Sequence, residues 1–252
     1  MIDVFWLPGT GFNTGPDGIS AAFGAALDPT RFNFVPLRYP AAYGTAMSYA
    51  ESVAAGRRIL LDAVEASTHD AIIGGYSQGA GIAGDVAAQI WRSWPTDPVV
   101  GCALIADPLR PRGAGISALP IASGYGIAGE RPIDGVFANR TTPVWWVAAE
   151  GDPITSLPAG NPLRSIADLT EFMCLASPGD AHRWGADLVD RAVRGRWQRW
   201  WSPANVLSWG GALAYARGYL PRPIGDGRHT QAYLDEGLAV GLAKAINEAV
   251  RE

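Results

Sequence analysis

The chain has 252 residues, of which 48% are hydrophobic and 17% are charged. This composition is typical of a globular protein with a sizeable core, and it excludes a disordered or fibrous chain. Lys and Arg number 20 against 24 Asp and Glu, a formal net charge of -4. This balance argues against a protein that holds nucleic acid by neutralising phosphates, so we expect no nucleic-acid partner.

Short apolar runs alternate with helix-like segments along the first 150 residues. The apolar runs predict strands over residues 2–7, 32–37, 71–76, 99–106 and 144–149. The periodic segments predict helices over residues 19–27, 47–67 and 78–94. Such alternation indicates an α/β fold in one domain over residues 1–252, with a mostly parallel sheet covered by helices on both faces.

The second half of the chain has a different organisation. Residues 107–142 are rich in glycine and proline and are expected to form an irregular surface connection. Residues 154–226 are expected to form a helical insertion within the domain, and a last helix is predicted over residues 230–250. The clearest element of the insertion is an amphipathic helix over residues 186–201, with an apolar stripe at Ala186, Val189, Val193, Trp197 and Trp200.

Membrane insertion and export are not indicated by the sequence. The longest apolar runs fall well below the roughly 20 residues that a membrane helix needs. The amino terminus lacks the pattern of a signal peptide and begins directly with the first predicted strand. We therefore expect a chain without a transmembrane segment, made in the cytoplasm. Cys102 and Cys174 are expected to be buried free thiols.

A serine stands where the third predicted strand meets its helix. The motif Gly75-Tyr76-Ser77-Gln78-Gly79 matches the nucleophile elbow, a sharp strand-to-helix turn that exposes a serine above the carboxyl edge of a sheet. The turn is strained and brings backbone close on both sides, so glycines flank it. Ser77 is the predicted nucleophile.

A serine hydroxyl needs a general base to accept its proton, and the sequence offers three histidines. His69 precedes the strand that leads to Ser77, which places it at the opposite end of the sheet. His182 lies in the insertion. His229 lies in a glycine-flanked loop before the last helix. Hydrolases that carry this elbow have the chain order serine, acid, histidine, which favours His229 as the base. His182 remains the alternative.

The base in turn needs a carboxylate to orient it. Asp152 follows the fifth predicted strand and therefore lies at the correct edge of the sheet. Asp107 also ends a strand before a proline and is its competitor. Asp152 is favoured because it lies two strands on from the nucleophile strand, which leaves room for the imidazole. Asp180 and Asp226 are interpreted as solvated loop acids.

The tetrahedral intermediate of acyl transfer needs two hydrogen-bond donors for its oxyanion. The backbone N–H of Gln78, directly after the serine, is expected to supply one. The loop after the first strand should supply the other, and Thr10 within Pro8-Gly9-Thr10-Gly11 is the candidate. The same loop lacks a Walker lysine and a complete dinucleotide fingerprint. We expect neither a metal nor an organic cofactor.

The chain resembles the lysin B family of mycobacteriophages, which are cutinase-like serine esterases, at Leu7-Pro8-Gly9-Thr10-Gly11, Gly75-Tyr76-Ser77-Gln78-Gly79-Ala80, Gly151-Asp152-Pro153-Ile154 and His229. The resemblance spans essentially the whole chain. It implies an α/β-hydrolase fold, a helical insertion between acid and histidine, and a triad of Ser77, Asp152 and His229. It also implies a monomer that hydrolyses the mycolyl-arabinogalactan ester at the host cell envelope during phage lysis.

Other functions fit the same motifs. A generic cutinase or lipase would act on simpler lipid esters, and an acyltransferase would pass the acyl group to a sugar hydroxyl. A protein of another class, a non-catalytic wall-binding protein on a hydrolase fold, would keep the motif without turnover. Five of the ten tryptophans lie in the insertion, where they form either its own core or an apolar trough for acyl chains: Trp184, Trp197, Trp200, Trp201 and Trp209.

Overall fold

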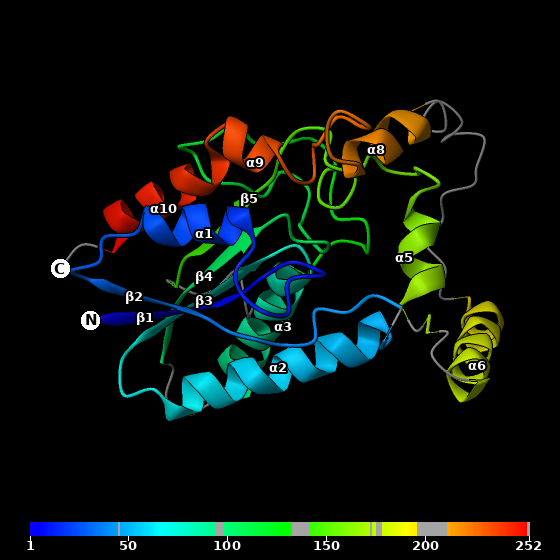
Figure 1. Ribbon diagram of the computed structural model, residues 1–252, viewed down its shortest axis with the longest axis horizontal. Coiled ribbons are helices and arrows are strands. Elements are labelled where there is room, and N and C mark those ends of the chain that lie inside the picture. The colour runs from blue at the N-terminus through cyan, green and yellow to red at the C-terminus, as the bar shows by residue number, and fades with distance from the viewer. Residues whose placement is uncertain are drawn as a thin grey trace.

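A five-stranded parallel sheet forms the centre of the protein, seen in a computed structural model that describes residues 1–44, 46–93, 98–132, 142–171, 173–174, 178–195 and 211–250. The strand order is β2-β1-β3-β4-β5 (Figure 1). The strands are β1 (Ile2–Leu7), β2 (Phe32–Pro36), β3 (Ala71–Tyr76), β4 (Val99–Ile105) and β5 (Val144–Val147). All five predicted strands are confirmed, with differences of one or two residues at their ends.

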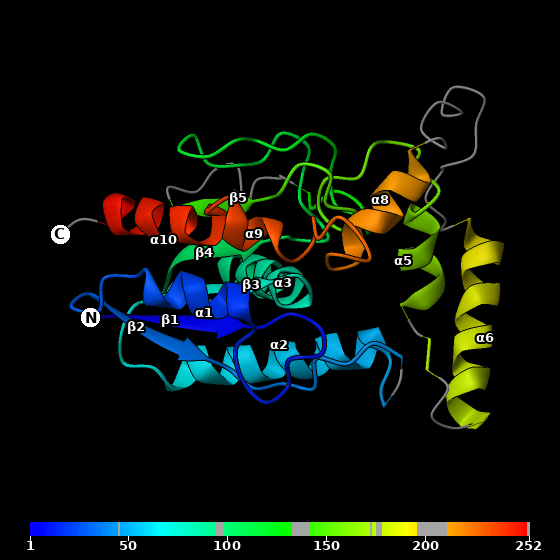
Figure 2. The ribbon, with the colours of Figure 1, turned by 45° about the horizontal axis from the view of Figure 1, so that its top comes forward.

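Helices cover both faces of the sheet, as predicted (Figure 2). Helices α1 (Gly18–Ala25) and α10 (Leu238–Ala249) pack on one face, and α2 (Tyr49–Ala66) and α3 (Gln78–Ser93) pack on the other. Successive strand residues point to opposite faces. In β3, Ile72 therefore packs in the core under α1 and α10, and Ile73 packs in the core under α2 and α3. Both faces are buried, which explains why the strands are continuous apolar runs.

Two of these helices have side chains that cap their amino-terminal ends. The Asp17 carboxylate accepts the Ser20 N–H at the start of α1. At the start of α2, Ser48 and Glu51 form a reciprocal capping box. Both caps satisfy N–H groups that have no partner within the helix.

The insertion lies beyond the carboxyl end of the sheet (Figure 1). It contains α5 (Arg164–Thr170), α6 (Pro178–Arg194) and α8 (Ala212–Tyr219). Parallel strands all end at one edge, so the insertion lies next to the loops that follow β1, β3 and β5. None of the helices in the described ranges is long and apolar enough to cross a membrane.

Helix α6 differs from the amphipathic helix predicted over residues 186–201. Val189 and Val193, on the predicted apolar stripe, are 64% and 81% exposed. The opposite side of the helix faces the protein through Arg191, whose guanidinium pairs with Asp187 and Glu171. The ion pair of Arg191 with Glu171 therefore helps to hold this helix against the protein. Four of the tryptophans expected in the insertion lie outside the described residues: Trp197, Trp200, Trp201 and Trp209.

The last predicted helix, over residues 230–250, is two helices. A short α9 (Ala232–Asp235) ends before Gly237, which has a φ of +67° and precedes α10. A left-handed conformation interrupts a helix and suits glycine because it lacks a Cβ. The break lets α9 follow the histidine loop while α10 packs on the sheet.

Residues 107–132 are irregular, as predicted, but they are not confined to the surface. Arg110 is fully buried, and its guanidinium donates to the carbonyl oxygens of Thr155 at 2.8 Å, Ala114 at 2.9 Å and Ser123 at 2.7 Å. Burial lowers the pKa of this arginine. Arg110 thus replaces regular secondary structure as the partner of the loop carbonyls.

We expect the substitution Arg110→Met to lower the free energy of unfolding by about 3 kcal/mol, because it leaves several buried carbonyls without a donor. Denaturant unfolding measures the change. Arg58→Met, on the exposed side of α2, is the control and should change stability by less than about 0.5 kcal/mol. Equal effects of the two substitutions would contradict this role of Arg110.

Candidate active site

Ser77 occupies a strained turn between β3 and α3. Its φ is +55°, a left-handed conformation that is rare for a residue with a Cβ. The neighbouring backbone leaves no room for side chains, since a Cβ on Gly75 would lie 2.7 Å from the Leu7 carbonyl oxygen and one on Gly79 would lie 2.1 Å from it. The chain therefore forms a nucleophile elbow, and with the parallel sheet it defines an α/β-hydrolase fold.

His229 is the histidine that lies beside the serine. Its Nε2 is 3.0 Å from Ser77 Oγ, and both residues are nearly buried, at 5% and 9% exposure. His182 lies exposed on α6. The His69 ring lies 3.3 Å from Asp3, at the amino-terminal end of the sheet. The structure thus brings His229 to the serine and keeps the other two histidines away from it.

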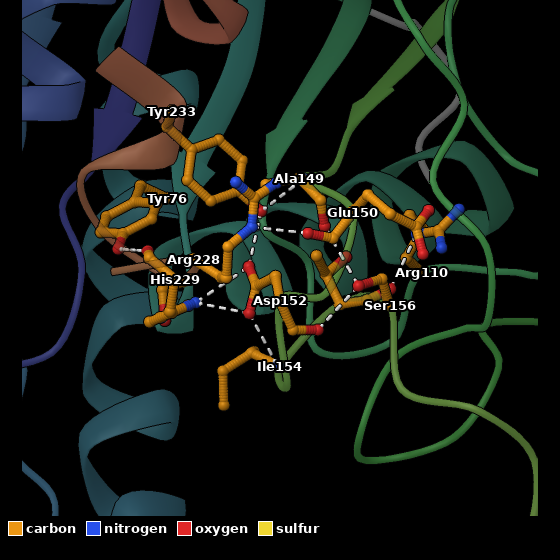
Figure 3. A network of polar contacts seen from close by, with 12 residues as sticks. Tyr76, Arg110, Ala149, Glu150, Asp152, Ile154, Ser156, Arg228, His229 and Tyr233 are labelled. Carbon is orange, nitrogen blue, oxygen red and sulfur yellow. Dashed lines mark hydrogen bonds and ion pairs between the residues drawn. The ribbon is translucent and has the colours of Figure 1, made fainter. Parts of the chain in front are cut away.

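Asp152 contacts His229 Nδ1, whereas Ser77 lies at Nε2 of the same ring. Figure 3 shows the Asp152 carboxylate beside the imidazole. Both of its carboxylate oxygens are 3.0 Å from His229 Nδ1, and the side chain is fully buried. The turn after β5 passes through Gly151 at a φ of +79°. In this turn the Ile154 N–H donates to Asp152 Oδ1 at 2.8 Å. The turn thus holds a buried carboxylate against the histidine.

The competing acids have other partners. The Asp107 carboxylate accepts from Trp146 Nε1 at 3.1 Å and from the Leu109 N–H at 2.9 Å, and it pairs with Arg131 at 3.3 Å. Asp226 pairs with Arg217. Asp180, interpreted as a loop acid, lies instead within α6 (Pro178–Arg194). Asp152 is therefore the acid that the structure brings to His229.

Two tyrosine rings enclose the imidazole. Tyr76 and Tyr219 stack on His229 with ring centroids 5.4 Å away in each case. The Tyr76 hydroxyl also donates to the His229 carbonyl, and the His229 N–H donates to the Gly218 carbonyl at 3.0 Å. Tyr76 ends β3, whereas Gly218 and Tyr219 end α8. The core and the insertion therefore position the histidine together.

The backbone donors of the loop after β1 are only partly hydrogen-bonded. The Gly9 N–H donates to Asp17 at 3.0 Å, the Gly11 N–H to Ala41 at 2.8 Å and the Phe12 N–H to Gly9 at 3.3 Å. The N–H of Thr10 has no hydrogen-bond partner among the described residues. Gln78 is the first residue of α3, where an N–H lacks an intrahelical acceptor.

The buried phenol of Tyr39 connects the loop after β1 to the first residue of α3. The Tyr39 hydroxyl lies 2.9 Å from the Pro8 carbonyl oxygen and 3.0 Å from Gln78 Oε1. Gln78 Nε2 also donates to the Ala42 carbonyl at 3.1 Å. These contacts set the distance between the β1 loop and the start of α3. Burial raises the pKa of Tyr39 well above its usual value, so the hydroxyl keeps its proton.

Sequence motifs assign no role to the tyrosines around the histidine and the acid. Tyr233 is fully buried in α9, and its hydroxyl donates to Asp152 Oδ2 at 2.6 Å. Burial, followed by the charge of Asp152, raises the pKa of Tyr233 well above its usual value. The available signal was spacing: Tyr233 follows His229 by four residues, and Tyr76 directly precedes Ser77.

Residues 30–138 match the PE-PPE domain, a segment that contains Ser77 but neither Asp152 nor His229. No curated protein matches the sequence significantly.

Similar solved structures are an acetyl xylan esterase, lysin B from mycobacteriophage D29 and a cutinase-like protein from Cryptococcus sp.. Their identities to this chain are 20%, 20% and 16%, with TM-scores of 0.46, 0.49 and 0.47. The alignments cover 76%, 98% and 77% of this chain and 97%, 88% and 90% of theirs.

We expect Gly79→Ala to destabilise the protein by about 2–3 kcal/mol, because the added methyl group meets the Leu7 carbonyl and must displace backbone. Gly185→Ala is the matched control, since nothing lies within 4 Å of a Cβ at that position in α6. It should leave stability unchanged or raise it by up to about 1 kcal/mol. Thermal unfolding of both variants measures the difference, and a neutral Gly79→Ala would show that the elbow is not close-packed.

Proposed function

We propose that the protein is a serine esterase that hydrolyses lipid esters through a covalent acyl-enzyme. The observation that carries the proposal is the alignment of three buried side chains, with Ser77 Oγ 3.0 Å from His229 Nε2 and His229 Nδ1 3.0 Å from Asp152. Placed on a nucleophile elbow, this arrangement matches the geometry of serine hydrolases.

The reaction follows from this geometry. Ser77 Oγ attacks the ester carbonyl carbon while His229 Nε2 accepts the hydroxyl proton, and Asp152 stabilises the imidazolium. The N–H groups of Thr10 and Gln78 bind the oxyanion of the tetrahedral intermediate. Collapse of the intermediate breaks the bond to the alcohol, which leaves with the proton from His229. Water then attacks the acyl-enzyme with the same base, releasing the acid and restoring Ser77.

Exposed apolar side chains near this edge favour a lipid substrate. Phe12, two residues from Thr10, is 46% exposed, and Tyr219, stacked on His229, is 51% exposed. Leu220 and Ile224 follow at 42% and 75%. An exposed aromatic ring stacked on the histidine of the site suits an acyl chain better than a polar substrate. We further propose the mycolyl ester of arabinogalactan as the substrate, on the sequence resemblance to lysin B, with action at the cell envelope.

Substitution of the proposed nucleophile and base tests the chemistry. Ser77→Ala should lower turnover of a chromogenic ester by on the order of 10⁴ to 10⁶ without changing the fold. His229→Ala should have an effect on the order of 10⁴, whereas His182→Ala, at an exposed position, should leave turnover within about twofold.

A serine-directed phosphonate followed by mass spectrometry identifies the labelled residue in the same samples. Absence of any label on Ser77 would favour a non-catalytic wall-binding protein. A large loss of turnover in His182→Ala would contradict the assignment of His229 as the base.

Product analysis tests the substrate. Incubation with purified mycolyl-arabinogalactan should release free mycolic acids, because water is the acceptor in the proposed reaction. The same incubation with excess sugar acceptor separates hydrolysis from transfer, since a transferase would yield acylated sugar. Activity on short esters with no release of mycolic acid would identify a generic cutinase or lipase instead.

A further inference from the structure

Among the described residues, the carboxylate of Asp152 has one side-chain donor besides the histidine. Oδ1 accepts the Ile154 N–H at 2.8 Å, and Oδ2 accepts the Tyr233 hydroxyl at 2.6 Å. His229 Nδ1 is 3.0 Å from both oxygens. In the part of the chain that the structure describes, His229 is also the only ion-pair partner of Asp152. Besides the imidazole, two donors therefore bind this fully buried carboxylate: the Ile154 N–H and the Tyr233 hydroxyl.

Tyr233 connects the segments that must meet at this point. It lies in α9, one turn after His229, and the Ala232 N–H donates to the Gly227 carbonyl of the histidine loop at 3.0 Å. The Tyr233 oxygen also accepts the Ala149 N–H, at the end of β5, at 3.2 Å. One phenol thus links the acid, the strand before it and the helix that follows the base (Figure 3).

We propose that Tyr233 is a positioning residue that holds the Asp152 carboxylate in line with His229. A hydrogen bond to an ionised acceptor is short and strong, and it fixes the direction of the carboxylate. Without it, Oδ2 keeps the imidazole as its remaining partner, and the carboxylate is held by the Ile154 N–H and His229 alone. This role rests on the proposed esterase function and deepens it.

Other groups around Asp152 do not replace this contact. The titratable groups that face it or act on its charge are Tyr76, Arg110, Tyr219, His229 and Tyr233. The Tyr76 hydroxyl is bonded to the His229 carbonyl, and the Arg110 guanidinium is bonded to loop carbonyls. Tyr219 stacks on the imidazole. Tyr233 is the member of this group whose hydroxyl lies on the carboxylate.

The test is Tyr233→Phe, which removes the hydroxyl and keeps the ring. We expect kcat on a soluble ester to fall by about tenfold, with KM unchanged, because the hydrogen bond orients the acid and does not contact substrate. Active-site titration with a phosphonate normalises the rate to folded protein. The His229 Nδ1 proton, followed by NMR, should move upfield as its carboxylate partner loses its fixed direction.

Tyr49→Phe is the matched control, because it removes a phenol between α2 and α3 that lies outside this network. It should retain the kcat of the wild-type protein. A Tyr233→Phe variant with wild-type kcat and an unshifted Nδ1 proton would overturn the positioning role while leaving the esterase intact. A wild-type protein that neither takes up phosphonate nor turns over any ester would overturn the esterase, and this role with it.

If Tyr233→Phe does not fold, the wild-type protein provides the measurement. The Tyr233 hydroxyl proton should be protected from exchange and visible by NMR. It should shift when phosphonate modifies Ser77, because the adduct changes the charge that Asp152 faces. A rapidly exchanging hydroxyl, or one that does not respond to the adduct, would overturn the proposal.

Discussion

The hydrogen bond between Ser77 Oγ and His229 Nε2 joins residues that are 152 positions apart in the sequence. It can form only because parallel strands end at a common edge, so the loops after β3, after β5 and before α9 meet there. The elbow directs the serine out of the sheet at the cost of a left-handed backbone at Ser77. Glycines at 75 and 79 make that geometry possible, since the Leu7 carbonyl occupies the space of a side chain.

Buried phenols hold the parts of the candidate site in place. The hydroxyl of Tyr39 lies between the two loops that carry the proposed oxyanion donors, that of Tyr76 binds the backbone of the histidine, and that of Tyr233 binds the acid. Burial raises the pKa of each of them well above its usual value. A phenol is well suited to this task, because its ring packs in an apolar core while its hydroxyl satisfies a buried acceptor.

Irregular backbone surrounds the acid, and buried arginines stabilise it. Arg110 and Arg164 donate to carbonyls of residues 114–127 and 155–158, and Arg131 pairs with Asp107 and Asp85. Burial lowers the pKa of Arg164 to about 10. The long connection between β4 and β5 thus acts as a fixed support for the Asp152 turn, although its described part contains no helix or strand.

The sequence alone determined the sheet, its main helices and the serine Ser77, because apolar periodicity and the Gly-Tyr-Ser-Gln-Gly motif are local signals, and it favoured His229 and Asp152 without deciding them. It did not decide between His182 and His229 as the base, or between Asp107 and Asp152 as the acid. The distance between two loops is not encoded in the sequence of either loop. Tertiary structure decided both, by placing an arginine at Asp107 and an imidazole at Asp152. It also decided the role of Tyr233 and the exposure of Val189 and Val193, because burial depends on neighbours distant in the chain.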